Sequence, residues 1–220
     1  MRRIFKYLPI LLIFLVFVNC KPKVLFKKAQ PKRIKNLHYL PAEYLGKYLN
    51  VKDSSVLTID SIIILHEEFE FSKMTRQELY EDIDTVINHD TTVYIDENWV
   101  IAIRIFGDSA SYSSYMVDTL FNLDNNDVLR KYEGYLFLNK LSDNELWEIS
   151  IMKLTSDSLL FDPLVRSSEI DSLRSITRIR EIKDPEEENK IKEYHLNPTR
   201  KQLRKILEKH PVEYSYLPVK

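Results

Sequence analysis

The chain has 220 residues with 32 basic and 33 acidic side chains, so its formal net charge at pH 7 is only −1. This balance excludes a strongly basic nucleic-acid-binding protein. The three glycines, Gly46, Gly107 and Gly134, are too scattered for a phosphate-cradling loop, which needs clustered glycines. The abundance of Ile, Leu, Tyr and Phe indicates a folded domain of ordinary size rather than a disordered stalk.

The first residues have the form of an export signal. Three basic residues within the first seven precede an uninterrupted apolar stretch at 8–18, and lysines follow it. The stretch is too short to span a bilayer, which needs about 20 apolar residues, and Pro9 argues against a stable membrane helix. A charged beginning followed by a short apolar segment is typical of a secretory signal peptide.

The only cysteine of the chain, Cys20, stands just after this apolar stretch. The residues before it, Phe17-Val18-Asn19, make a poor site for an ordinary signal peptidase, which cuts after small residues. The segment 1–20 resembles a bacterial lipoprotein signal with Cys20 as the lipobox cysteine. The resemblance implies that residues 1–19 are a lipoprotein signal peptide and that Cys20 becomes the acylated first residue. An uncleaved signal anchor and a conventional cut after Cys20 are the alternatives.

The lipoprotein resemblance implies a membrane-anchored protein of the cell envelope. Each buried methylene contributes about 0.8 kcal/mol, so two or more acyl chains such as palmitate on Cys20 would hold firmly. Lys21 stands where an aspartate commonly retains lipoproteins in the inner membrane, which favours the outer membrane, facing the periplasm. The mature chain would carry 29 basic and 33 acidic residues and no disulfide.

A basic segment follows the cysteine. The stretch 21–35 holds seven basic residues and no acidic one, interrupted by Pro22 and Pro31. We expect residues 20–35 to form the lipidated cysteine and an extended, mobile tether. Such a tether is a solvated linker or, alternatively, an electrostatic contact with anionic head groups.

Residues 36–220 are predicted to form a single β-rich domain. Short apolar or alternating segments are separated by Asp-, Ser- and Asn-rich turns, a spacing that favours an antiparallel barrel or sandwich. Strands are expected at 56–65, 68–71, 91–95, 99–105, 112–123, 134–139, 146–154 and 159–161.

Two segments read as helices. Thr75-Arg76-Gln77-Glu78 has the form of a capping box and predicts a short helix ending near Ile83. Asn197-Pro198 predicts the start of a C-terminal helix over 197–210, with Pro211 ending it. The stretch 168–182 predicts a helical turn followed by a strand from Ser175.

The most suggestive catalytic motif is Phe106-Gly107-Asp108-Ser109. It resembles the nucleophile block of the GDSL esterases, which would make Ser109 the nucleophile. Such an enzyme needs an Asp-x-x-His pair near the C-terminus to activate the serine. Here His195 is preceded by Lys192 three residues earlier, and His210 by Leu207. A hairpin turn is the simpler interpretation of Gly-Asp-Ser.

The sequence nominates no metal or cofactor site. The five histidines lack the spacing of a zinc site, and the acidic stretch at 80–90 lacks the glycine of an EF-hand loop. Aromatic residues are abundant and could stack on sugars or line a lipid pocket. Trp99 and Trp147 each begin an alternating apolar face, which favours a place in the core, with a binding role as the alternative.

These observations lead us to expect a non-enzymatic binding or interaction module on a lipid anchor, without cofactors and without nucleic acid. Its partners would be the membrane, through Cys20, and an apolar ligand or an envelope protein. A barrel followed by a C-terminal helix is faintly similar to lipocalin-like domains, and this resemblance implies a cavity for an apolar ligand. An envelope serine hydrolase using Ser109 is the alternative.

Overall fold

The computed structural model describes residues 21–82, 91–95, 98–142, 144–185, 187, 190–210 and 214–219. Its described elements are mainly strands, as the sequence predicted. The strands are β1 (Lys23–Phe26), β2 (Gly46–Asn50), β3 (Val56–Ile59), β4 (Ile63–Thr75), β5 (Thr91–Ile95), β6 (Trp99–Phe106), β7 (Ser109–Asn122), β8 (Val128–Tyr132), β9 (Tyr135–Leu141), β10 (Trp147–Leu154), β11 (Leu159–Pro163), β12 (Ile179–Lys183), β13 (Ile191–Leu196) and β14 (Ser215–Pro218). The helices are η2 (Ala42–Tyr44), α2 (Arg76–Asp82), η3 (Leu123–Asn125), η4 (Ser167–Glu169), α3 (Ile170–Leu173) and α4 (Arg200–Lys209).

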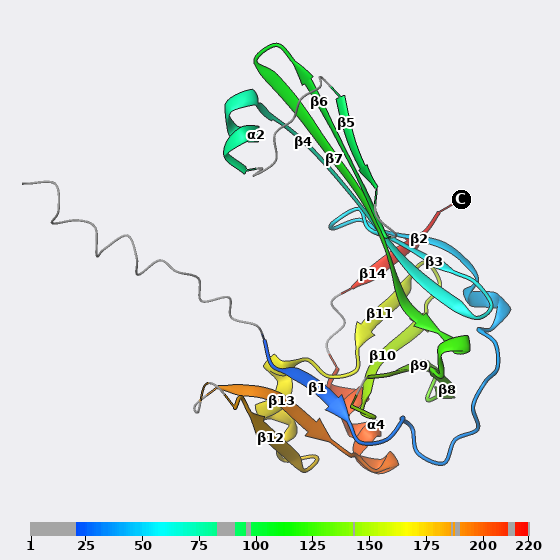
Figure 1. Cartoon of the computed structure of the whole chain (residues 1–220). Helices are drawn as coiled ribbons and strands as arrows, with labels where there is room; N and C mark the ends of the chain where they lie inside the picture. Colours follow the sequence, from blue (N-terminus) through cyan, green and yellow to red (C-terminus); the bar gives the residue numbers. More distant parts are fainter. Residues whose placement is uncertain are drawn as a thin grey trace, which may run out of the picture.

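All the described strands belong to one mixed sheet (Figure 1). Its order is β12-β13-β1-β10-β11-β14-β2-β3-β4-β7-β6-β5, with β9 joined to β10 and β8 to β9. Among the described residues this path does not close on itself, so the expected closed barrel is not found. The sheet is also not wholly antiparallel, because β1 runs parallel to β13.

We call the part of the fold formed by β2, β3, β8 to β11, β14 and the inner ends of β4 and β7 the body. Its hydrophobic core, the body core, lies where the two halves of the sheet face each other. Strands β2, β3, β4 and β7 contribute Tyr48, Leu57, Ile64 and Phe121, and strands β8 to β11 supply the apolar side chains opposite them. These side chains are almost fully buried and fill the interior. This packed centre differs from the ligand cavity that the lipocalin-like resemblance implied.

One buried carboxylate connects two strands, β7 and β9, that do not pair with each other. The buried side chain of Asp127 accepts hydrogen bonds from the main-chain N–H groups of Asn122, 2.8 Å away, and Leu141, 3.1 Å away. Burial raises the pKa of Asp127, although these two bonds and the nearby Lys140 act in the opposite direction. Asp127 thus joins the ends of β7 and β9 where no strand pairing does so.

We call the region formed by β1, β12, β13, α3 and α4 the base. A second hydrophobic core, the base core, lies between this region and the other side of β9 and β10. Phe137, Ile149 and Ile151 point into it, while their strand neighbours point into the body core. Helix α4 covers this core with Leu203, Ile206 and Leu207, the apolar stripe seen in the sequence.

Helix α4 begins two residues later than predicted. Thr199, not Asn197, is the N-cap, because its hydroxyl accepts from the Gln202 N–H while the Gln202 side chain accepts from the Thr199 N–H. Pro198 therefore lies outside the helix, and Pro211 lies outside the described residues.

The prediction of a mobile tether over 20–35 is wrong for the described residues from 21 onward. Leu25 and Phe26 of β1 are buried between β13 and β10. Beyond them Gln30 is fully buried and exchanges main-chain hydrogen bonds with the side chain of Asn139. The buried positions could not be recognised in the sequence, because lysines alternate with or flank the few apolar residues that hold the segment in place.

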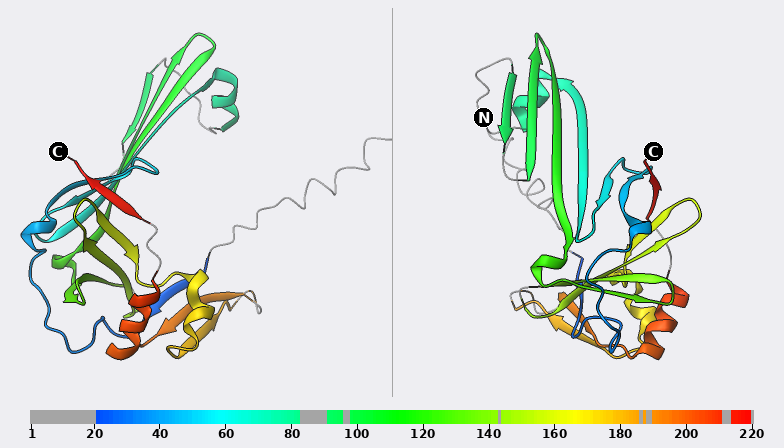
Figure 2. Two further views of the ribbon diagram at one scale, coloured as in Figure 1. Left: turned by 180° about the vertical axis from the view of Figure 1, so that it is seen from behind. Right: turned by 90° about the vertical axis from the view of Figure 1, so that its right-hand side faces the viewer.

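A long β-arm projects from the body (Figure 1, Figure 2). It consists of the outer parts of β4 and β7, which pair continuously, together with β5, β6 and α2. The predicted capping box is confirmed: Glu78 accepts from the Thr75 N–H at 2.7 Å, and Thr75 Oγ1 accepts from the Glu78 N–H. Leu79 of α2 packs on Ile103 and Ile105, which gives the arm a small core of its own.

Candidate functional site

The face of the arm that points away from α2 is apolar and uncovered. Residues opposite one another across the four strands share this face, and one row runs Phe69, Tyr115, Val100 and Ile95. Several of these side chains are far more exposed than apolar residues in a folded domain usually are, with Ile95 77% and Phe69 62% exposed. We call this surface the outer apolar face; its exposed large side chains are Phe69, Phe71, Val93, Ile95, Phe106 and Tyr115.

The charges beside the outer apolar face are unevenly distributed. Lys73 and Arg104 lie two rows further out than Phe69, beyond the row of Phe71 and Val93, and each is paired in register with Ser111 of β7. Neither forms an ion pair within the described part of the chain, and the Lys73 ammonium lies 6.0 Å from the centre of the Phe71 ring. A hollow of about 760 Å³ at this end is lined by Phe71, Lys73, Arg104 and Phe106, among others. The outer end of the face therefore combines apolar and positive groups with one carboxylate, Glu78, which already accepts hydrogen bonds from Thr75.

The acidic residue at the inner end of this face is already engaged. Glu67 accepts hydrogen bonds from the hydroxyls of Thr58 and Tyr115 and from the Lys47 ammonium. The Thr58 bond, followed by the Tyr115 bond, lowers the pKa of Glu67 below its ordinary value. Its carboxylate is consequently occupied by side chains of this chain.

The opposite face of the arm carries a groove at its root. Its volume is about 470 Å³, and it lies between the arm and the β2–β3 turn. Among its lining residues are Asp53, Glu68, Glu70, Trp99, Tyr112 and Met116. Aromatic faces beside carboxylates favour a cationic group.

The two tryptophans have different environments. Trp99 is about one-third exposed and lines this groove, so it does not lie in a core as the alternating pattern favoured. Trp147 is half-buried and packs against the base core. The structure does not bring the two side chains together, and a shared aromatic site is not formed.

Ser109 lies in a hairpin turn, as the simpler interpretation predicted. It is exposed at the first position of β7, at the outer tip of the arm, after Gly107 with its φ of +60°. His195 in β13 and His210 after α4 belong to the base, at the other end of the molecule (Figure 1). Neither of these two histidines can therefore activate Ser109, and the geometry gives the esterase alternative no support.

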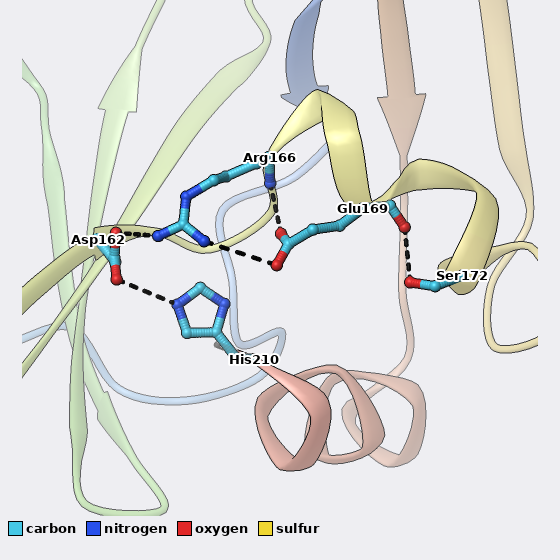
Figure 3. Close-up of polar contacts among 5 residues, drawn as sticks. All are labelled: Asp162, Arg166, Glu169, Ser172 and His210. Carbon is cyan, nitrogen blue, oxygen red and sulfur yellow. Dashed lines mark hydrogen bonds and ion pairs between the residues drawn. The ribbon is translucent and has the colours of Figure 1, made fainter. Parts of the chain in front are cut away.

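A buried polar cluster connects β11, η4 and the end of α4 (Figure 3). Arg166 forms an ion pair with Asp162 and lies 3.7 Å from Glu169 Oε1. His210 Nε2 lies 3.8 Å from Asp162 Oδ2, and its side chain is only 2% exposed. The nearby Ser172 hydroxyl donates to the Glu169 carbonyl, and the ion pairs of Asp162 and Arg166 connect these elements.

The described residues contain no group of three or more His, Cys, Asp or Glu side chains able to hold a metal ion. None of the helices described is long and apolar enough to cross a membrane. Cys20 lies outside the described residues, so its acylation stays a prediction.

Comparison with protein families, with curated proteins and with solved structures finds no match for this chain. The site is therefore defined by its own geometry. Sequence reasoning missed the outer apolar face, although its signal was present. Phe69, Phe71, Val93 and Ile95 lie at alternate positions of their segments, and only the strand order shows that no other described element covers them.

Proposed function

We propose that this chain is a lipid-anchored envelope protein that binds another envelope protein through the outer apolar face of its arm. The single observation that carries the proposal is the gathering of six exposed large apolar side chains on one face of the sheet. Contiguous apolar patches of several hundred Å² are rare on monomers and mark interaction sites.

Charge complementarity favours a different protein over a second copy of this chain. The cations Lys73 and Arg104 adjoin the face, and Glu67, the acid at its inner end, is already engaged. Glu78 also lines the hollow beside these cations, but its carboxylate accepts hydrogen bonds from the N–H and hydroxyl of Thr75. Within the described residues, two copies facing each other would therefore offer no free carboxylate from this face to those cations. The expected partner presents an apolar centre with acidic side chains positioned over Lys73 and Arg104.

The anchor supports a role at the membrane surface. Only Lys21 and Pro22 separate Cys20 from β1. A connection of about three residue steps spans roughly 10 Å at most. Acyl chains on Cys20 would hold the body against the bilayer, here proposed to be the outer membrane on its periplasmic side. We further infer that the body is a sandwich-like scaffold, whose role is to hold the arm in a fixed position.

The partner is tested by photo-crosslinking in the producing bacterium. A benzoyl-phenylalanine placed at Phe69 or Ile95 of the full chain should give a defined adduct, whereas the same probe at exposed Tyr39 on the body should not. Charge reversal, Lys73→Glu with Arg104→Glu, should reduce the adduct at least fivefold. Changing acidic residues of the identified partner to lysine should restore it.

Three results would contradict this proposal. They are an adduct only between two copies of the chain, an adduct only with lipid, and a protein adduct that is insensitive to the charge reversal. The anchor has its own test, because radiolabelled palmitate should enter the wild-type chain but not Cys20→Ser.

A further inference from the structure

We infer that a basic pocket at the base of the molecule binds the phosphate group of a soluble small molecule. The pocket lies where β1, β12 and β13 meet the start of α4, far from the arm (Figure 1). Its volume of about 570 Å³ is within the range of small-molecule sites, roughly 300–1,000 Å³. The side chains that carry the argument are Lys27, Arg178, Arg180, His195, Asn197 and Gln202.

The fold brings these residues together from separate parts of the chain. Arg180 of β12 lies directly opposite His195 of β13, and Arg178 stands just before β12. The main-chain N–H of Lys27 donates to the carbonyl of Leu196 at 2.9 Å, which places the end of β1 beside the end of β13. Three positive side chains therefore line one concavity.

These three cations differ from three arginines nearby in the base that are neutralised by carboxylates. Arg166, Arg174 and Arg204 each form an ion pair with a carboxylate. Within the described part of the chain, Lys27, Arg178 and Arg180 form none, and the described lining of the pocket contains no acidic side chain. Glu193, two residues from His195, already contacts the His195 ring at 2.8 Å. The pocket therefore holds an uncompensated positive charge.

Two arginines and a lysine suit phosphate. Each guanidinium offers parallel N–H donors that match two phosphate oxygens, and lysine adds a point charge. The carboxamides of Asn197 and Gln202 lie at the start of α4, where the helix dipole also favours an anion. A dianionic phosphate group would pair with more of the pocket's N–H donors and positive charges than a single carboxylate could.

The position of the pocket favours a soluble ligand over a lipid head group. The preference for a soluble ligand over a lipid rests on the proposed anchor at Cys20. The phosphate site itself does not depend on that anchor. Lys27 follows the last residue of β1, so the four-residue strand lies between the pocket and the anchored end. That strand alone is about 13 Å long at 3.3 Å per residue.

The test is calorimetric titration of the full chain in detergent with inorganic pyrophosphate. The double variant Arg178→Gln, Arg180→Gln should bind pyrophosphate at least tenfold more weakly than the wild type. The control Lys205→Gln, Lys209→Gln removes the same charge from exposed positions of α4 outside the pocket and should stay within twofold. Lys27→Gln, on a different element, should weaken binding at least threefold, with thermal unfolding midpoints confirming that each variant is folded.

No measurable binding to the wild type, or equal losses in the double variant and the control, would overturn the phosphate site. Short-chain phosphatidylglycerol, titrated in the same detergent, distinguishes the two sources. If it bound at least tenfold more tightly than pyrophosphate in an Arg178- and Arg180-dependent manner, the soluble source would be overturned.

Discussion

The hydroxyl of Tyr115 donates a hydrogen bond of 2.8 Å to Glu67 Oε2 across the root of the arm. Oε1 of the same carboxylate accepts from Thr58 of β3 and from Lys47 of β2. One side chain thus joins strands of the body to the long β7 strand of the arm. Its loss should affect both the stability of the protein and the position of the arm.

Glu67→Gln should lower the free energy of unfolding by about 1–3 kcal/mol at pH 7, because hydrogen bonds to a charged group become weaker neutral ones. The folded protein lowers the pKa of Glu67 below its ordinary value of 4.5. The stabilisation is therefore fully present above that value and is lost as the pH falls through the lowered pKa. Denaturant unfolding of both proteins at pH 7, 5 and 3 should show the difference between them shrinking at acidic pH.

Glu70→Gln is the matched control, because Glu70 is exposed on the same strand and its carboxylate forms no hydrogen bond within the described part of the chain. It should leave the free energy of unfolding within about 0.5 kcal/mol of the wild type. A Glu67→Gln protein with an unchanged stability profile across these pH values would contradict the bridging role of Glu67.

Asn139 should hold the basic segment 27–35 in place. Its amide accepts from the Gln30 N–H at 2.6 Å and donates to the Gln30 carbonyl at 2.9 Å. Asn139→Ala leaves these buried groups without partners, at a cost of about 2–4 kcal/mol for the two. Limited trypsin digestion should then cut among the lysines of 27–35 in the variant but not in the wild type, with exposed Asn144→Ala as the control. Equal resistance of all three proteins would show that other contacts hold the segment.

The strand-rich nature of the chain could be predicted because most strands have a recognisable pattern in their own residues. Trp147, Ile149 and Ile151 alternate with polar residues, and Asp- and Ser-containing turns separate the strands. The start of helix α2 could likewise be predicted, because the capping box of Thr75 and Glu78 involves only residues close in sequence. Such features depend only on neighbours in sequence, which is the information that a sequence displays.

The features that were missed depend on partners distant in sequence. β1 is a strand because β13 and β10 provide edges for Lys23–Phe26, some 120 to 170 residues later in the chain. Trp99 lines a groove because the β2–β3 turn, with Asp53 and Ser55, lies beside that face of the arm. The same strand order leaves Phe69 and Ile95 uncovered, although their alternation resembles that of a half-buried strand.

The arm should unfold independently of the body, because its small core shares no buried residue with the other two. Leu79→Ala removes the fully buried contact between α2 and β6, a change that typically costs 2–5 kcal/mol. Hydrogen exchange should accelerate in β6 and the outer part of β7 and stay unchanged in β9 and β10. The control Gln77→Ala, at an exposed position of α2, should change neither region. Faster exchange throughout the sheet would mean that the arm and body unfold together.

The outer apolar face should contribute little to the stability of the isolated protein. Phe69→Ser with Ile95→Ser removes side chains that are mostly exposed, so the unfolding midpoint should change by less than about 3 °C. The concentration at which the protein begins to associate should rise, because the apolar patch is reduced. Static light scattering and thermal unfolding measure the two effects, with Val51→Ser on the body as the control. A large loss of stability would show instead that this face is part of the folded core.

Asp162 should be the most sensitive residue of the buried polar cluster in the base. Its side chain is 3% exposed, and it faces Arg166 on one side and His210 on the other. Asp162→Asn removes the nearer and more deeply buried of the two carboxylates that face the Arg166 guanidinium, and breaking a buried pair costs about 3–5 kcal/mol. The exposed ion pair of Arg204 with Glu133 provides the comparison, because Glu133→Gln should cost at most about 1 kcal/mol. Denaturant unfolding separates the two variants, and a cost for Asp162→Asn as small as that for Glu133→Gln would mean that the cluster does not hold β11 to the end of α4.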